Sequence, residues 1–112
     1  MVRTPGPGEG LRRGVIELAV LGLLADGPRY GLQIVEELSR TPALAVPAGT
    51  VYPLVSRLLS EGLIASRWQE APQGPPRKYY RLTSAGTKRL TVLNQAWQDL
   101  RAALDDLLEE IR

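Results

Sequence analysis

The sequence predicts a mainly α-helical fold with one small β-hairpin, in the order helix, helix, helix, hairpin, long helix. Two periodicities support this prediction. Apolar residues recur every three or four positions in four segments, as on one face of a helix, and they alternate in one stretch near residues 63–82, as in strands. A chain of 112 residues with 44% hydrophobic and 23% charged residues suits a single folded domain.

The first half of the chain predicts a flexible arm and two helices. Residues 1–10 hold three glycines and two prolines and little to bury, so we expect a flexible N-terminal arm. Residues 11–25 are apolar on almost every side, which indicates a buried central helix that ends at the turn formed by residues 26–28. Residues 30–40 predict a short amphipathic helix, whose apolar face holds Leu32 or Tyr30 together with Ile34, Val35 and Leu38.

A third helix and a hairpin follow. The apolar face of this helix comprises Val51, Leu54, Val55, Leu58 and Leu59, and Gly62 ends it. Pro53 leaves the start of the helix open by several residues, because proline is tolerated best in a first turn. Residues 63–69 and 77–82 alternate on either side of a Pro/Gly loop, which predicts a β-hairpin, and we expect Trp68, Tyr80 and Leu82 to face the core.

The last helix is predicted from about Ala85 toward Arg112, with Thr83 or Ser84 as its cap. Its apolar residues are spaced alternately by three and four, as in helices that pack lengthwise on another helix. They are Leu90, Leu93, Trp97, Leu100, Leu104, Leu107 and Ile111. The chain offers no second long helix of similar reach, so we predict a homodimer with these residues in the interface.

This order of elements is that of a winged helix-turn-helix unit, here residues 11–83, followed by a C-terminal dimerisation helix, residues 84–112. The hairpin is the wing. Proteins of this architecture usually bind double-stranded DNA, with the third helix in the major groove and the wing over neighbouring phosphates. The alternative is a winged-helix module for protein–protein interaction without specific DNA binding.

The composition disfavours other classes of function. Cysteine and histidine are absent, which removes thiolate nucleophiles, imidazole bases and most zinc sites, so we expect neither an enzyme nor a cofactor or metal. No signal peptide is recognisable, and the longest apolar run, residues 18–25, is too short to cross a membrane. We therefore expect a cytoplasmic protein.

Charge is distributed unevenly along the chain. Residues 51–89 carry seven basic side chains and two acidic ones, whereas residues 90–112 carry two basic and five acidic ones. The formal net charge of the whole chain, +2, does not show this contrast. A basic middle segment suits contact with a phosphate backbone, and we expect the acidic end to face away from it. The alternative is that these are ordinary charges exposed to solvent.

The outward-facing residues of the third helix and the wing are the candidate DNA contacts. On the helix they include Thr50, Tyr52, Ser56 and Arg57, of which Arg57 is the strongest candidate because a guanidinium can donate two bonds to a guanine edge. Thr50 and Ser56 have solvent exposure or capping as the alternative. On the wing, Arg77 and Lys78 follow the loop, where they would contact phosphates or protect a strand edge from aggregation.

Three stretches make the chain resemble the PadR family of bacterial transcription regulators over nearly its whole length from Leu11. They are RGVIELAVLGLLADGPRYGLQIVEEL, PAGTVYPLVSRLLSEGLI and GPPRKYYRLTSAG. The single C-terminal helix is similar to that of the small, multidrug-responsive repressors in the family. The resemblance implies a ligand-responsive repressor acting as a homodimer on a near-palindromic operator. It also implies a phosphate contact for Tyr30 and places Thr50, Tyr52 and Arg57 on the recognition helix.

Trp97 is the candidate effector-binding residue. It is the bulkiest member of the apolar repeat, so two indoles at a two-fold axis would hold the helices apart and leave a flat slot, unless Trp97 simply fills the interface. Aromatic walls favour planar aromatic or cationic small molecules. In the small family members, the equivalent tryptophan lines a cavity for such ligands.

Overall fold

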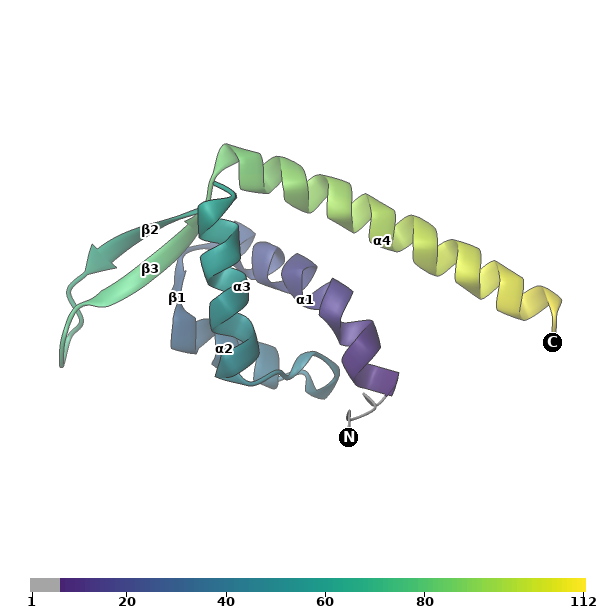
Figure 1. Cartoon of the computed structure of the whole chain (residues 1–112), viewed down its shortest axis with the longest axis horizontal. Helices are drawn as coiled ribbons and strands as arrows, with labels where there is room; N and C mark the ends of the chain where they lie inside the picture. Colours follow the sequence, from purple (N-terminus) through teal and green to yellow (C-terminus); the bar gives the residue numbers. More distant parts are fainter. Residues whose placement is uncertain (1–6) are drawn as a thin grey trace, which may run out of the picture.

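The computed structural model describes residues 7–112, with side chains described from residue 14 onward. Its elements are α1 (Pro7–Asp26), β1 (Arg29–Tyr30), α2 (Gly31–Ser39), a 3₁₀ turn (Pro42–Leu44), α3 (Ala48–Ser60), β2 (Ile64–Gln69), β3 (Arg77–Leu82) and α4 (Ser84–Glu110). The predicted order of three helices, hairpin and long helix is confirmed. In Figure 1 the hairpin extends to one side of the first three helices and α4 to the other. No helix within residues 7–112 combines the length and hydropathy needed to cross a membrane.

The first helix begins earlier than predicted. Residues 7–10, expected to belong to a flexible arm, form the first turn of α1. Pro7 suits this position because the first helical residue needs no amide proton. The rest of the predicted arm, residues 1–6, lies outside the described residues.

The core lies where α1, α2 and α3 meet. Its buried side chains are Ile16, Val20, Leu21, Leu24, Ile34, Leu38, Val51, Val55, Leu58 and Ile64. The predicted inward faces of α2 and α3 are therefore confirmed at the buried positions. Leu32 differs, because its side chain is 51% exposed at the start of α2.

Helix α3 begins at Ala48, so Pro53 lies inside it rather than in its first turn, and the side chain of Pro53 is exposed. The helix ends as predicted at Gly62. Gly62 has a φ of 73°, its amide donates to the carbonyl of Leu59 at 3.1 Å, and the amide of Leu63 donates to that of Leu58 at 3.0 Å. This pair of bonds is a Schellman motif, which favours glycine at the residue after the cap.

The hairpin belongs to a three-stranded antiparallel sheet in the order β1-β3-β2. Strand β1 was not predicted, since two residues are too few to show an alternation. The alternation places Ile64 and Trp68 on the same face, but the core placement of Trp68 is wrong: its side chain is 67% exposed. The hairpin extends beyond the helices, so only its base, with Ile64, Tyr80 and Leu82, packs against the core.

Close contacts with the segment that follows α3 fix the start of α4. The Thr83 hydroxyl accepts from the amide of Gly86 at 3.1 Å, which confirms Thr83 as the cap, and donates to the carbonyl of Gly62 at 2.7 Å. A Cβ on the buried Gly86 would lie 1.9 Å from the carbonyl oxygen of Leu63. Only glycine permits this close approach of α4 to the end of α3.

The beginning of α4 packs against the chain's own core. Leu90 and Leu93 contact the core formed by α1, α2 and α3, and α1 lies beside this part of α4 (Figure 1). Helix α1 therefore supplies a partner that the sequence analysis assigned entirely to a second copy. Leu90 and Leu93 are partly buried by these contacts within the chain, and their place in a dimer interface stays a prediction.

Candidate nucleic-acid interface

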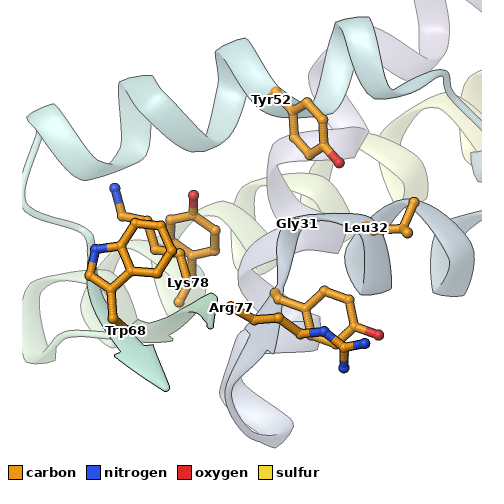
Figure 2. Close-up of a pocket in the computed structure, with 8 residues that line it drawn as sticks. Gly31, Leu32, Tyr52, Trp68, Arg77 and Lys78 are labelled. Carbon is orange, nitrogen blue, oxygen red and sulfur yellow. The ribbon is translucent and has the colours of Figure 1, made fainter. Parts of the chain in front are cut away.

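An open groove of about 410 Å³ lies between the start of α2, helix α3 and the hairpin. Figure 2 shows Tyr52 reaching down from α3, with Trp68 and Lys78 on one side and Gly31 and Leu32 on the other. The complete lining is Tyr30, Gly31, Leu32, Tyr52, Trp68, Arg77, Lys78 and Tyr80. The groove thus combines four aromatic side chains with two cations and no carboxylate.

Both cations of the groove lie over aromatic rings. The guanidinium carbon of Arg77 is 4.6 Å from the ring centre of Tyr30, and the ammonium of Lys78 is 5.9 Å from that of Tyr80. Tyr30 in turn meets Tyr79 edge to face, with ring centres 5.4 Å apart. Cation–π contacts hold a positive charge in place without neutralising it. Arg77 and Lys78 therefore keep their charge available to an anion.

Tyr52 enters the groove from α3 because Gly31 leaves space for it. Its side chain is 45% exposed, and its ring packs on the backbone of Gly31. A Cβ on Gly31 would lie 2.6 Å from Cε1 of Tyr52. Burial, and secondarily the neighbouring phenol of Tyr52, raises the pKa of Tyr80.

The other predicted residues of α3 divide into two groups. Thr50 and Ser56 are exposed on the same helix as Tyr52, and Ser56 follows Tyr52 by four residues, on the same side of the helix. Arg57 lies outside the groove.

The guanidinium of Arg57 is bound to two carboxylates. It contacts Glu17 of α1 and donates to Glu61 at 2.7 Å, while Glu17 also accepts from Arg89 of α4 at 3.4 Å. The contact with Glu17 and, less strongly, that with Glu61 raise the pKa of Arg57. These carboxylates balance the positive charge of Arg57, and the side chain connects α3 to α1. The sequence had predicted that this side chain is free to contact bases.

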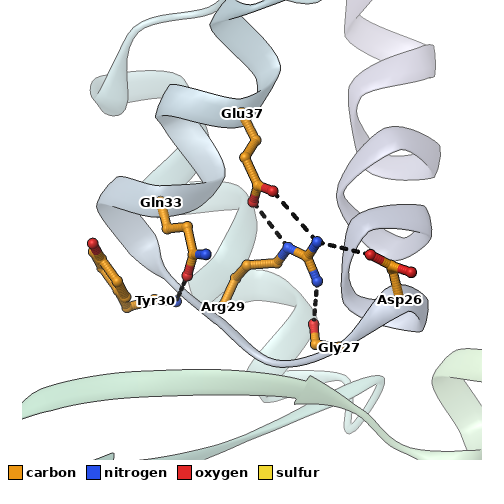
Figure 3. A network of polar contacts seen from close by, with 6 residues as sticks. All are labelled: Asp26, Gly27, Arg29, Tyr30, Gln33 and Glu37. Carbon is orange, nitrogen blue, oxygen red and sulfur yellow. Dashed lines mark hydrogen bonds and ion pairs between the residues drawn. The ribbon is translucent and has the colours of Figure 1, made fainter.

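A polar network fixes the edge of the groove at Tyr30 (Figure 3). Arg29, nearly buried, donates to Glu37 at 2.9 Å, to Asp26 at 3.1 Å and to the carbonyl of Gly27 at 2.8 Å. The bond to Glu37 is the main reason that the pKa of Arg29 is raised, against the opposing effect of burial. The network closes the turn between α1 and α2 and so positions Tyr30, whose amide donates to the side chain of Gln33 at 3.4 Å.

Several residues of the groove were missed by the sequence analysis. Trp68 and Tyr80 were assigned to the core, and Gly31 and Leu32 were given no binding role. The signal that could have identified Trp68 is the polar Ser66, which separates it from Ile64 on the same face of the strand.

The apolar stripe of α4 continues past the part that packs on the core. Trp97 is 38% exposed, and the later members of the stripe are at least half exposed. These are Leu100, Leu104, Leu107 and Ile111, with Leu108 beside them, a residue that the predicted repeat did not include.

Comparison with known proteins places the chain among regulators of transcription. The model of the transcriptional regulator PadR-like family matches residues 20–92. Transcriptional regulator Rv3488 of Mycobacterium tuberculosis is 35% identical over 100 residues, which cover 89% of this chain and 85% of that protein. The crystal structure of a PadR family transcriptional regulator from Eggerthella lenta has a TM-score of 0.81 at 39% identity, covering 90% of this chain and 88% of that one. A PadR-like transcription factor from Bacteroides fragilis gives 0.74 at 36%, covering 88% and 95%. The chain therefore belongs to the PadR-like family of transcriptional regulators, proteins that act on transcription and are not enzymes.

Proposed function

We propose that this transcriptional regulator is a homodimeric, ligand-responsive repressor that binds a near-palindromic operator through α3 and the wing. The observation that carries the proposal is the groove between α3 and the hairpin, which holds two cations and no carboxylate. In this arrangement α3 enters the major groove, and Thr50, Tyr52 and Ser56 face base edges or phosphates. The wing brings Arg77 and Lys78 to the neighbouring backbone.

Arg57 has a different role in this proposal. Recruiting it to DNA would require breaking its contacts with Glu17 and Glu61, whereas Lys78 needs no such exchange. We assign Arg57 to holding α3 against α1, and sequence reading to the exposed side chains nearer the start of α3.

The homodimer is proposed from the outer half of α4. This half carries an uninterrupted stripe of exposed apolar side chains, from Trp97 to Ile111, and extends away from the other helices (Figure 1). Such a stripe is stabilised by packing on a second helix, and the same stripe of another copy offers the right spacing. Two-fold symmetry would then set the two α3 helices about 34 Å apart, or a multiple of it, on a near-palindromic operator.

The effector is proposed to bind at Trp97. This residue is the first of the stripe beyond Leu93, so in the dimer it would lie where the two helices begin to pack. A planar aromatic or cationic small molecule would stack there. In a Trp68→Phe variant, Trp97 is the remaining tryptophan. We expect such compounds to quench its fluorescence and to reduce binding to the operator. A Trp97→Leu variant that still responds to the compound would contradict this role.

The first experiment is fluorescence anisotropy of the protein on the DNA upstream of its own coding sequence, with a scrambled duplex of equal length, at two salt concentrations. We expect salt-sensitive binding that prefers the upstream duplex, because phosphate contacts release counterions. Lys78→Ala should weaken binding to both duplexes and lower the salt slope by about 1. The control is Lys88→Ala, at an exposed position of α4 outside the groove, and it should do neither. Wild-type protein without salt-dependent DNA binding would contradict the proposal and favour a protein-interaction module.

A further inference from the structure

Trp68 is an exposed aromatic residue that the core does not use. In the hairpin register Ile64 pairs with Leu82, Ser66 with Tyr80 and Trp68 with Lys78, so the members of these pairs share one face of the sheet. The first two pairs lie at the base of the hairpin, whereas Trp68 is 67% exposed beside the groove. A large apolar side chain held open to water next to a cation suits a partner that offers apolar and anionic surface together.

The groove as a whole has this double character. Trp68, Tyr52 and Leu32 give it apolar walls, while Arg77 and Lys78 supply positive charge. Within residues 14–112 no carboxylate forms an ion pair with either cation; the described ion pairs involve other arginines. A fitting ligand therefore has an anionic group flanked by a face of C–H groups.

The position of the groove selects the ligand. In duplex DNA the sugar–phosphate backbone is the ridge between the major and the minor groove. The protein groove lies between α3 and the hairpin (Figure 2). If α3 enters the major groove with the wing beside it, this groove would lie over that ridge. We propose that this groove is a seat for one nucleotide of the DNA backbone, with the phosphate held by Lys78 and the deoxyribose packed against Trp68, which pairs with Lys78 on the same face of the hairpin. This inference rests on the proposed function and adds Trp68 to it as a DNA contact that does not depend on the base sequence.

The proposal gives Trp68 and Lys78 separable signatures. Trp68→Ala should lower affinity for the upstream and the scrambled duplex by the same factor, roughly tenfold, because it removes apolar contact with a sugar that every sequence has. It should leave the salt slope unchanged. Lys78→Ala should also weaken both duplexes, but with a lower salt slope. Trp68→Phe, which keeps an aromatic wall, should fall between wild type and Trp68→Ala.

Trp68 can also report its own contact. The chain has two tryptophans, so in a Trp97→Phe variant all tryptophan emission comes from Trp68. Titration with either duplex should change this emission and saturate together with the anisotropy. In duplexes that carry one neutral methylphosphonate linkage at a time, one linkage per half-site should weaken wild type but cause no further loss in Lys78→Ala. That linkage identifies the seated phosphate.

Each result decides for or against the seat. If the duplex binds with full anisotropy change while Trp68 emission stays constant and Trp68→Ala keeps full affinity, the seat is wrong and the proposed function stands. If Trp68→Ala reduces binding to the upstream duplex alone, Trp68 reads bases, and the backbone seat is overturned. A response of Trp68 to planar aromatic anions but not to DNA would overturn it in favour of a small-molecule site. Thermal melting of each variant checks that the fold is intact.

Discussion

Replacement of Gly31 by alanine separates the stability of the fold from the shape of the groove. Gly31 is the first residue of α2 and lies under the ring of Tyr52, so the new methyl carbon would be 2.6 Å from Cε1 of that ring. Carbon atoms in ordinary contact are about 3.5 Å apart, so the ring must withdraw by about 0.9 Å. The ring is the exposed end of a side chain and can do so. The predicted effect is a displaced Tyr52 in an otherwise intact fold.

The expected magnitudes follow from this geometry. Gly31 does not have a positive φ, so alanine reduces the entropy of the unfolded chain by an amount worth about 0.4–1 kcal/mol, which offsets the cost of moving Tyr52. The free energy of unfolding should therefore change by less than about 1 kcal/mol. Affinity for the upstream duplex should fall by about 1–3 kcal/mol, the usual cost of losing one specific contact.

Anisotropy titrations and thermal melts of Gly31→Ala measure the two effects separately. Gly22→Ala is the matched control, since Gly22 is an exposed residue of α1 with no atom within 4 Å of the added Cβ. It should raise the melting temperature slightly and leave DNA binding unchanged. In a Tyr52→Ala background, Gly31→Ala should cause no further loss of affinity. Additive losses in that background, or full affinity of Gly31→Ala alone, would refute the reasoning that Gly31 acts through Tyr52.

Three further predictions concern the junctions of the fold. Gly86→Ala should destabilise the protein by about 3 kcal/mol, seen in chemical denaturation, because its Cβ would overlap the rigid backbone of Leu63; an unchanged midpoint would contradict this. Arg57→Ala should lower stability by about 1 kcal/mol and leave the preference for the upstream over the scrambled duplex intact; a loss of that preference would restore Arg57 as a base-reading residue. Leu104→Lys should shift sedimentation velocity from dimer to monomer, and a persistent dimer would place the interface elsewhere.

The elements of the fold were predictable because their signals are local. The buried faces of α2 and α3 follow from apolar residues three and four positions apart. Gly62 marks the end of α3 and Thr83 the start of α4, each through a hydrogen bond to a residue three positions away. Such signals need no knowledge of the rest of the molecule. The start of α1 at Pro7 was missed because a segment rich in glycine and proline has little apolar pattern to read.

The groove was harder to predict because it depends on how elements are placed. Alternation gives the correct face for Trp68, but its exposure depends on how far the hairpin extends beyond the helices. A helical wheel likewise directs Arg57 outward, and only the docking of α1 reveals that Glu17, forty positions away in sequence, meets it there. Both differences have the same origin: the sequence pattern tells which side of an element a residue is on, but not what lies opposite it.

Helix α4 joins the two proposed binding activities mechanically. Its first turns are fixed to the DNA-binding unit by the Thr83 cap, the close approach at Gly86 and the packing of Leu90 and Leu93. From Leu100 onward the apolar side chains of the stripe are at least half exposed. In a dimer that packs through this outer segment, each DNA-binding unit would move as one body with the start of its own α4. A ligand at Trp97 would therefore act at the pivot, where a small change in the angle between two helices alters the distance between two α3 helices without disturbing the contacts inside either groove.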